Sequence, residues 1–233
     1  MRYLFFVALS IPLLCSAQHT RPLGAFSALS VTGNIELTLV PGEPPELTLL
    51  DEEVEPDAIR IKLSREKLQI RHQDPLRLAD GNPIRLVVTY SHLKAVTAHL
   101  GAELRSEHPL HSEDLLVRST SGAEVALELY TNALDAGAFE GAELHLSGEA
   151  FSQQVAATTG GIYRADDLAC RRARVKAHTG GEAWVQAGEE LRASAKTGGS
   201  VYYYGEPEAL SFSEGLAGEI EQAGDAEPLP SAQ

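Results

Sequence analysis

The chain has 233 residues and carries 33 Asp and Glu against 19 Lys and Arg, a formal net charge of −14 at pH 7. This charge opposes binding to nucleic-acid phosphates and to anionic lipid, so we expect neither partner. Aromatic residues make up only 6% of the sequence, which predicts a narrow core. After the N-terminal segment, no stretch approaches the roughly 18 apolar residues that indicate a membrane span.

Residues 1–17 have the pattern of a signal peptide. Arg2 precedes an apolar run that ends at Leu14, and a small-x-small pattern follows, which predicts cleavage before Gln18. The run is shorter than the about 20 residues that a bilayer requires. The alternative is a lipoprotein attached through Cys15, but Leu14 occupies a position where lipoprotein signals usually have a small residue. We expect export to the periplasm, the outer-membrane surface or the medium.

A glycine-containing segment recurs about every twenty residues between residues 94 and 218. The spacings are 21, 19, 19, 20 and 18 residues, and the first glycines are Gly101, Gly122, Gly141, Gly160, Gly180 and Gly198. On both sides of the glycine, odd offsets are mostly apolar or small and even offsets mostly polar, as in strands with one buried face. A single rung cannot bury its inner face, but stacked rungs can. The pattern therefore predicts an all-β fold, a parallel β-helix or β-solenoid with rungs of about twenty residues.

The remaining sequence divides around these repeats. Residues 18–93 contain alternating strand patterns with a Pro and Gly turn, and we expect this β segment to flank or cap the N-terminal end of the solenoid. Residues 210–221 resemble a degraded last rung. The acidic, Pro-containing residues 219–233 predict a flexible tail.

The sequence resembles the head GIN domain proteins, also called putative auto-transporter adhesins, which are exported mainly by Bacteroidetes. The resemblance lies in VTGNIELTLVPGEPPELTLLDEE, IKLSREKLQI, PIRLVVTYSHLKAVTAHLGAE and the Thr-Gly-Gly rungs, over residues 24 to 220. It implies a β-helix-like, mostly two-part architecture and a cell-envelope location. The family has no agreed catalytic residues, so none is transferred to this chain.

Outward positions of the repeat provide the candidate binding residues. The position four residues after the corner glycine holds His145, Arg164, Trp184 and Tyr202 in successive rungs, and Tyr204 lies two residues further on. Aromatic side chains beside polar groups suit contacts with sugars or proteins. The candidate ligand-binding residues are Trp184, Tyr202, Tyr204, Arg164 and His145. The alternative is that a loop, the tail or a partner subunit covers them.

Two sets of side chains, one of glutamates and one of histidines, are candidate metal sites. Glu103, Glu124 and Glu143 would form a ladder of like charges, which solvation of the side chains, a cation, or neighbours such as Arg105 and His145 could relieve. Solvation is favoured, because no tight Asp or Asn loop suited to Ca²⁺ is present. Zinc needs three or four converging ligands, so the segment His108-Pro109-Leu110-His111, even with His99, favours a solvated loop. We expect no metal and no cofactor.

No nucleophile, zinc-protease or phosphate-binding motif occurs, and we expect no catalytic residue. The sole lyase-like cluster is Asp166-Asp167 with Arg164, Arg171, Arg172 and Lys176, which a surface ion-pair network explains equally well. The favoured hypothesis is a non-enzymatic, exported, adhesin-like binding module for a cell-surface glycan or protein. The alternatives are a polysaccharide lyase or hydrolase on a β-helix fold, and a purely structural envelope protein. The sequence contains no signal for an oligomeric state.

Overall fold

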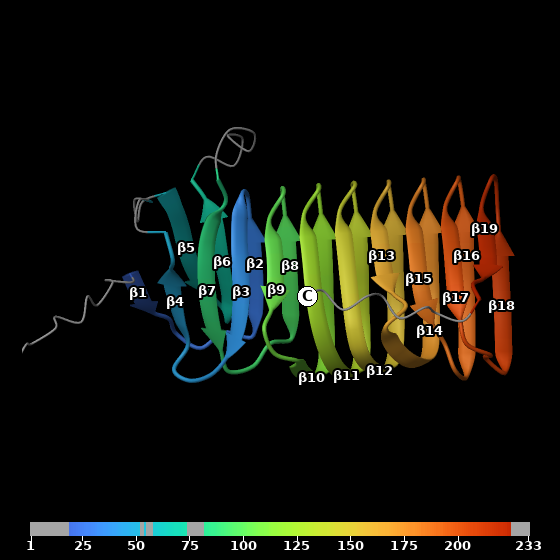
Figure 1. Ribbon diagram of the computed structural model, residues 1–233, viewed down its shortest axis with the longest axis horizontal. Helices are drawn as coiled ribbons and strands as arrows, with labels where there is room; N and C mark the ends of the chain where they lie inside the picture. The colour runs from blue at the N-terminus through green and yellow to red at the C-terminus, as the bar shows by residue number, and fades with distance from the viewer. Residues whose placement is uncertain (1–18, 52–53, 55–57, 74–81, 225–233) are drawn as a thin grey trace, which may run out of the picture.

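The computed structural model describes residues 19–51, 54, 58–73 and 82–224, and within them the chain forms an elongated stack of β rungs (Figure 1). The expected all-β solenoid is confirmed. The expected signal peptide at residues 1–17, Cys15 included, lies outside the described residues, as do residues 225–233 of the expected tail. No helix in the described part of the chain could cross a membrane.

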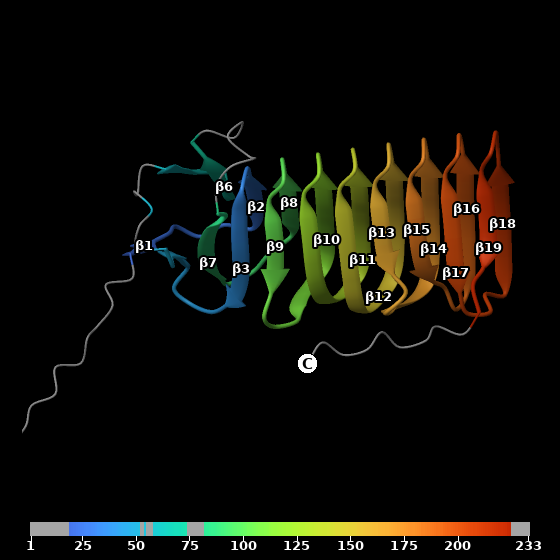
Figure 2. The ribbon, with the colours of Figure 1, turned by 45° about the horizontal axis from the view of Figure 1, so that its top comes forward.

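Each rung has one strand before a tight corner and one strand after it. The strands before the corner stack into one face, here called the pre-corner face, and those after it into the post-corner face (Figure 2). Several strands are long because they bend from the post-corner face into the next pre-corner strand. The strands of these rungs are β8 (Ala95–His99), β9 (Glu103–Ser106), β10 (Leu110–Thr120), β11 (Glu124–Phe139), β12 (Glu143–Thr158), β13 (Ile162–Ala165), β14 (Leu168–His178), β15 (Glu182–Gln186), β16 (Glu190–Lys196), β17 (Ser200–Tyr204), β18 (Ala209–Glu214) and β19 (Glu219–Gln222).

The six glycine corners between β8 and β17 share one backbone conformation. The corner glycine has φ between 70° and 73°, and the residue before it has φ between 53° and 56°. Two successive residues with positive φ are the pattern of a type I′ turn. At Gly122 an added Cβ would meet nothing within 4 Å, so the positive φ rather than lack of space favours glycine there. Corners also bond between rungs, since Gly122 N donates to Glu140 O at 3.2 Å.

The N-terminal residues supply rungs as well as end strands. The strands are β1 (His19–Pro22), β2 (Ala28–Thr32), β3 (Ile35–Pro41), β4 (Glu46–Leu49), β5 (Ile59–Ser64), β6 (Lys67–His72) and β7 (Ile84–Tyr90). The β2–β3 rung lies between the β6–β7 and β8–β9 rungs, so Val31 is opposite Ile70 on one side and Ala98 on the other. Antiparallel strands β1, β4 and β5 continue the sheet beyond β6 and β7. The rungs therefore begin before the expected boundary at residues 93 and 94.

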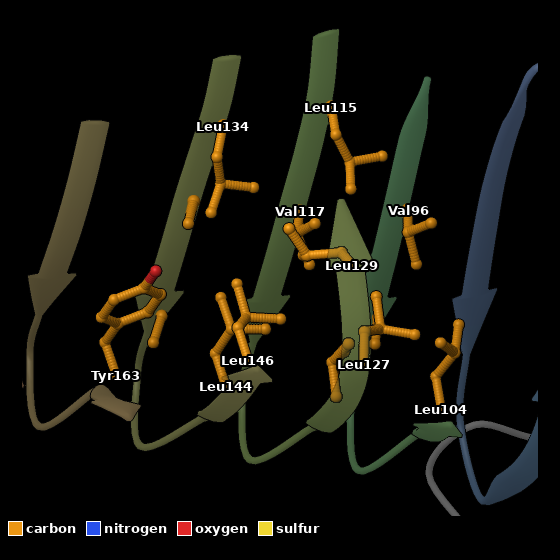
Figure 3. Packing of buried hydrophobic residues seen from close by; sticks show 14 of the residues in the cluster. Val96, Leu104, Leu115, Val117, Leu127, Leu129, Leu134, Leu144, Leu146 and Tyr163 are labelled. Atoms are coloured by element: carbon orange, nitrogen blue, oxygen red, sulfur yellow. The ribbon is translucent and has the colours of Figure 1, made fainter. Parts of the chain in front are cut away.

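The core is a continuous apolar column between the two faces (Figure 3). Val96, Val117 and Ala136 are paired in register on the pre-corner face. Leu104 and Leu144 are paired through Val125 on the post-corner face. Strands stack at about 4.8 Å, so each inner side chain packs on its equivalents above and below. The odd offsets from the corner glycine are inward, as the alternation predicted.

One polar network interrupts this apolar column. Tyr163 is fully buried where Leu144 stands in the preceding rung, and its hydroxyl donates to Gln153 Oε1 at 2.8 Å. Gln153 Nε2 in turn donates to Gln186 O at 3.3 Å. Burial raises the pKa of Tyr163 well above its ordinary value, so the hydroxyl stays a donor. Burial also raises the pKa of the nearby Cys170 thiol to about 11, which keeps it protonated and unreactive.

The last rung extends further than expected. β18 pairs with β16 and β19 with β17, which confirms a degraded rung at residues 210–221. Residues 219–222 are thus a strand rather than the start of a flexible tail, because Ile220 continues the inner column of Val201. Ala217, with φ of 51°, replaces the corner glycine. Glu214 takes the inner place that Ala195 holds in the rung before, and its carboxylate accepts a hydrogen bond from Ile220 N at 3.0 Å.

His99 is the titratable group most strongly tied to the stacking of the first rungs. Its Nδ1 lies 2.6 Å from Thr120 Oγ1 in the next rung. Burial lowers its pKa, and the nearby Lys67 and Arg71 lower it further. Because the unfolded chain then binds a proton more readily than the folded chain, stability is lost as the pH falls from the ordinary histidine range through the lowered pKa.

The buried network predicts a specific cost for Gln153→Leu. The substitution leaves the Tyr163 hydroxyl buried without an acceptor, and we expect the free energy of unfolding to fall by about 1–3 kcal/mol. Adding Tyr163→Phe should recover part of that loss. Urea unfolding followed by circular dichroism measures both. The exposed neighbour Gln154→Leu is the control, with an expected change within about 0.5 kcal/mol. Equal losses at 153 and 154 would contradict this account.

His99 predicts a pH dependence of stability. The His99→Gln variant should lose less stability than the wild-type chain when the pH is lowered from about 7 to about 5, because it removes a group whose unfolded state gains a proton in that window. Urea midpoints at several pH values give the two slopes. Gln154→Leu, an exposed substitution that changes no titratable group, is the control and should keep the wild-type slope. Parallel slopes for His99→Gln and the wild-type chain would refute the assignment.

Candidate functional site

The predicted outward row on the post-corner face is present. His145 lies opposite Arg164, Arg164 opposite Trp184, and Trp184 opposite Tyr202, in four successive rungs. Alternate residues of these strands are buried, so the row points away from the core. The alignment on the corner glycines thus gave the register of these residues.

Three members of the row form a tight stack. The guanidinium carbon of Arg164 lies 4.2 Å from the ring centroid of Trp184, and the Trp184 and Tyr202 rings stack at 5.0 Å with planes 21° apart. Cation–π and ring-stacking contacts therefore cover the indole from both neighbouring rungs. For this reason Trp184 and Tyr202 are half-buried rather than fully exposed, and their ring edges form the outer surface.

Tyr204 lies on the neighbouring row, opposite Gln186. Burial raises the pKa of Tyr204, the charge of Asp166 raises it further, and Arg164 opposes the shift. The Gln186 side-chain amide donates to the Asp166 carbonyl oxygen. Tyr204 is thus electrostatically coupled to the same surface as the stack, through Asp166 and Arg164.

A shallow depression adjoins the stack, and we call it the post-corner hollow. It has a volume of about 360 Å³, its charged lining residues are Arg105, Glu128, Arg164, Asp166 and Asp167, and His145 also lines it. The small side chains Ala126 and Ser147 leave this space between longer neighbours. His145 Nε2 lies 3.2 Å from Glu143 Oε2. His145 and Arg164 therefore line the hollow, while Trp184 and Tyr202 continue the row beyond its Arg164 side.

The glutamate ladder is longer than the sequence indicated. Glu36 lies opposite Glu103, and Glu103, Glu124 and Glu143 are paired in register. Ion pairs occur only toward its ends, between Arg105 and Glu36 and between His145 and Glu143, as far as the described residues show. No group of three or more His, Cys, Asp or Glu residues that could hold a metal ion is found among the described residues.

His99 and His111, two of the candidate zinc ligands, do not face a common point. His111 stacks on Tyr130 with ring centroids 5.2 Å apart. His99 instead contacts Thr120 on the pre-corner face.

The lyase-like cluster is divided between the faces. Asp166 and Asp167 line the post-corner hollow. Arg171 and Arg172 pair with Glu189, at 3.5 Å and 3.2 Å. Lys176 projects from the pre-corner strand β14 with its side chain exposed. Of the cations in this cluster, only Arg164 therefore shares the post-corner hollow with Asp166 and Asp167, and its guanidinium lies over the Trp184 ring.

Sequence reasoning missed a larger depression on the pre-corner face, here called the pre-corner trough. It has a volume of about 600 Å³, and Asp135, Gln154, Arg174 and Arg192 are among its lining residues. These four occupy the position six residues before the corner glycine in successive rungs. The sequence signal for them is their shared offset from the corner glycine, which places all four in one outward row.

Comparison with known proteins gives the family but no activity. The family model described as "Putative auto-transporter adhesin, head GIN domain" matches residues 25–207. No curated protein sequence matches the chain. A solved structure of a putative adhesin from Bacteroides fragilis is similar, with a TM-score of 0.80 at 16% identity, over 88% of this chain and 96% of that chain.

Two Parabacteroides structures extend the likeness. A putative adhesin from Parabacteroides merdae has a TM-score of 0.63 at 17% identity, over 89% of this chain and 96% of that chain. A protein from Parabacteroides distasonis named a putative lipid binding protein has a TM-score of 0.64 at 15% identity, over 90% of this chain and 98% of that chain. At these identities the likeness concerns the fold alone. From the family match over most of its length, the chain belongs to the head GIN domain family of putative auto-transporter adhesins.

Proposed function

We propose that the chain is a non-enzymatic, adhesin-like binding module that contacts a macromolecule through the post-corner face. The observation that supports this most directly is the Arg164–Trp184–Tyr202 stack beside a polar hollow. Arg, Trp and Tyr are the residues that most often dominate binding energies at protein interfaces. A stack held by two neighbouring rungs is rigid, so little conformational entropy is lost when it is covered.

The geometry favours a protein over a glycan as the occupant of this face. A sugar ring packs on a free aromatic face, whereas both faces of the Trp184 indole are taken by Arg164 and Tyr202. Ring edges, a guanidinium and the Tyr204 hydroxyl remain available, and these suit contacts with protein side chains and backbone. The adjoining hollow offers both cations and carboxylates to a polar side chain of the partner.

Export supports this role. The signal-peptide pattern at residues 1–17 and the family membership favour a cell-envelope or secreted protein. The periplasm, the outer-membrane surface and the medium are all compatible with that pattern. A rigid, narrow solenoid presents a long lateral surface for its mass, which suits a module that touches other molecules without transforming them.

The lyase or hydrolase alternative has only Arg164 beside Asp166 and Asp167 in the post-corner hollow, and that guanidinium is stacked on Trp184. Asp166 and Asp167 lie on the post-corner side, while Arg171 and Arg172 are engaged by Glu189. Acid–base work on a sugar requires groups that reach one substrate from a shared cleft. We therefore retain the binding role.

The stack predicts which substitutions weaken binding. We expect Trp184→Ala and Tyr202→Ala each to weaken binding by about 30-fold, the effect of losing one interface hot spot of about 2 kcal/mol. The probes are immobilised collagen, fibronectin and laminin, with a glycan array in parallel. Tyr130→Ala, an exposed aromatic on another row, is the control and should bind normally. Binding that survives the double alanine variant, binding confined to the glycan array, or binding to no protein probe would each overturn the proposed protein contact.

A second prediction concerns catalysis. Purified protein incubated with polygalacturonate or alginate should release neither unsaturated uronic ends nor new reducing ends. Among the cations of the cluster, only Arg164 lines the hollow with Asp166 and Asp167, and its guanidinium is held against Trp184. Absorbance of the unsaturated product and a reducing-sugar assay provide the two readouts. Cleavage that disappears in the Asp166→Asn variant would establish the enzymatic alternative instead.

A further inference from the structure

The pre-corner face carries a group of cations that the chain only partly neutralises. We call it the basic patch; its members are Arg172, Arg174, Lys176, Arg192 and Lys196 of β14 and β16. All five side chains are exposed. Arg172 pairs with Glu189 at 3.2 Å and Arg192 with Glu190 at 2.5 Å. Over the described ranges, Arg174, Lys176 and Lys196 form no ion pair.

The neighbours of Arg174 leave its charge uncompensated. Arg174 lies directly opposite Arg192 on one side and opposite the neutral Gln154 on the other. Beyond Arg192 the next residue in the row is the neutral Ser211. Like charges directly opposite on neighbouring strands, about 4.8 Å apart, repel each other. Glu190, which lies in the neighbouring outward row opposite Arg172, contacts Arg192 and partly reduces this repulsion.

The patch reverses the sign of charge that dominates the molecule. The whole chain has a net charge of −14, and the outward row of the post-corner face begins with Glu36, Glu103, Glu124 and Glu143. A cluster of exposed cations on so acidic a protein creates a local positive potential in a defined place. The patch is therefore a place on this acidic protein to which an anion is attracted.

The patch forms one end of the pre-corner trough. The trough is lined from five successive strands, β10, β11, β12, β14 and β16, so it runs along the axis of the coil. At about 4.8 Å per strand, this corresponds to a length of about 19 Å. Ala133 and Ser152 keep its middle open, and Gln154 and Ser152 offer neutral hydrogen-bonding groups. Asp114 and Asp135 lie toward the other end.

We propose that the trough binds a linear acidic polysaccharide. Its open, axial form fits an extended chain, and its Ser, Gln and Asp groups are partners for sugar hydroxyls. The unpaired guanidinium of Arg174, beside that of Arg192, is a fork that matches a uronate carboxylate. Binding of one carboxylate at this position also relieves the repulsion between the two arginines. The site is separate from the post-corner stack, on the opposite face of the coil.

Other anionic partners fit the trough less well. Single-stranded nucleic acid is held by aromatic platforms, and no aromatic side chain is among the lining residues that the structure describes. An anionic membrane surface is bound by cations together with inserted apolar or aromatic groups, and Leu116 is the sole large outward apolar side chain among the described lining residues.

The test compares polygalacturonate with its fully methyl-esterified form, which has the same backbone without the charges. We expect the wild-type chain to bind polygalacturonate at low salt, to bind the ester at least about tenfold more weakly, and to lose binding in about 0.5 M NaCl. The double variant Arg174→Gln/Arg192→Gln should weaken binding by about tenfold or more, since charged hydrogen bonds are lost. Calorimetry or affinity electrophoresis provides the measurement.

Matched controls separate this site from the rest of the protein. Lys67→Gln/Arg71→Gln makes the same charge change on β6 of the same face, outside the trough, and should bind within about twofold of the wild type. Trp184→Ala/Tyr202→Ala should bind polygalacturonate normally, so failure of the protein-binding proposal is distinguishable. Urea midpoints confirm folding of every variant. No wild-type binding, equal binding of the ester, an unaffected arginine variant, or stronger binding of oligothymidylate or phosphatidylserine vesicles would each overturn the proposal.

Discussion

The structure depends on one constraint, that every rung repeats the backbone path of its neighbours closely enough to hydrogen-bond with them. The corners are where this constraint is strictest. At each glycine corner the chain reverses within two residues of positive φ, and the corner amides donate to the carbonyls of the next corner. A corner with a different conformation would break the ladder on both sides of it. The need for the same positive-φ corner in each rung explains why glycine recurs in the sequence with nearly constant spacing.

The constraint also acts differently on the residues at inner positions of the coil and on those at outer positions. Inner side chains must fill the core together, and the large Tyr163 is followed by the small Ala183 in the next rung. Outer positions are free of packing but are held in rows about 4.8 Å apart. Rows of like residues therefore arise on each face: glutamates and an Arg, Trp and Tyr stack after the corner, and cations before it. On such a fold, binding side chains lie in rows along the strands rather than in loops.

Much of the fold and of the outward row could be predicted from the sequence, and there are physical reasons why the remaining features could not. The register of His145, Arg164, Trp184 and Tyr202 follows from the glycine spacing, because a side-chain period of two leaves one register that buries the apolar set. The half-burial of Trp184 does not follow, since it depends on how neighbouring side chains lean. The hydrogen bond of Tyr163 with Gln153 joins opposite faces and leaves no local pattern. The position of the β2–β3 rung in the stack depends on pairings with strands distant in sequence. No repeat within residues 18–93 indicates these pairings.

That inserted rung has a consequence for the order in which the chain folds as it is synthesised. The rung formed by β2 and β3 emerges early, yet its pairing partners on both sides, β6–β7 and β8–β9, lie later in the sequence. It remains an incomplete strand pair until the chain has been synthesised as far as residue 106. From that point, each later rung finds a finished template and adds to it in sequence order. Assembly thus starts near the N-terminal end of the stack, and it proceeds in one direction only after β2 and β3 have paired with both neighbouring rungs.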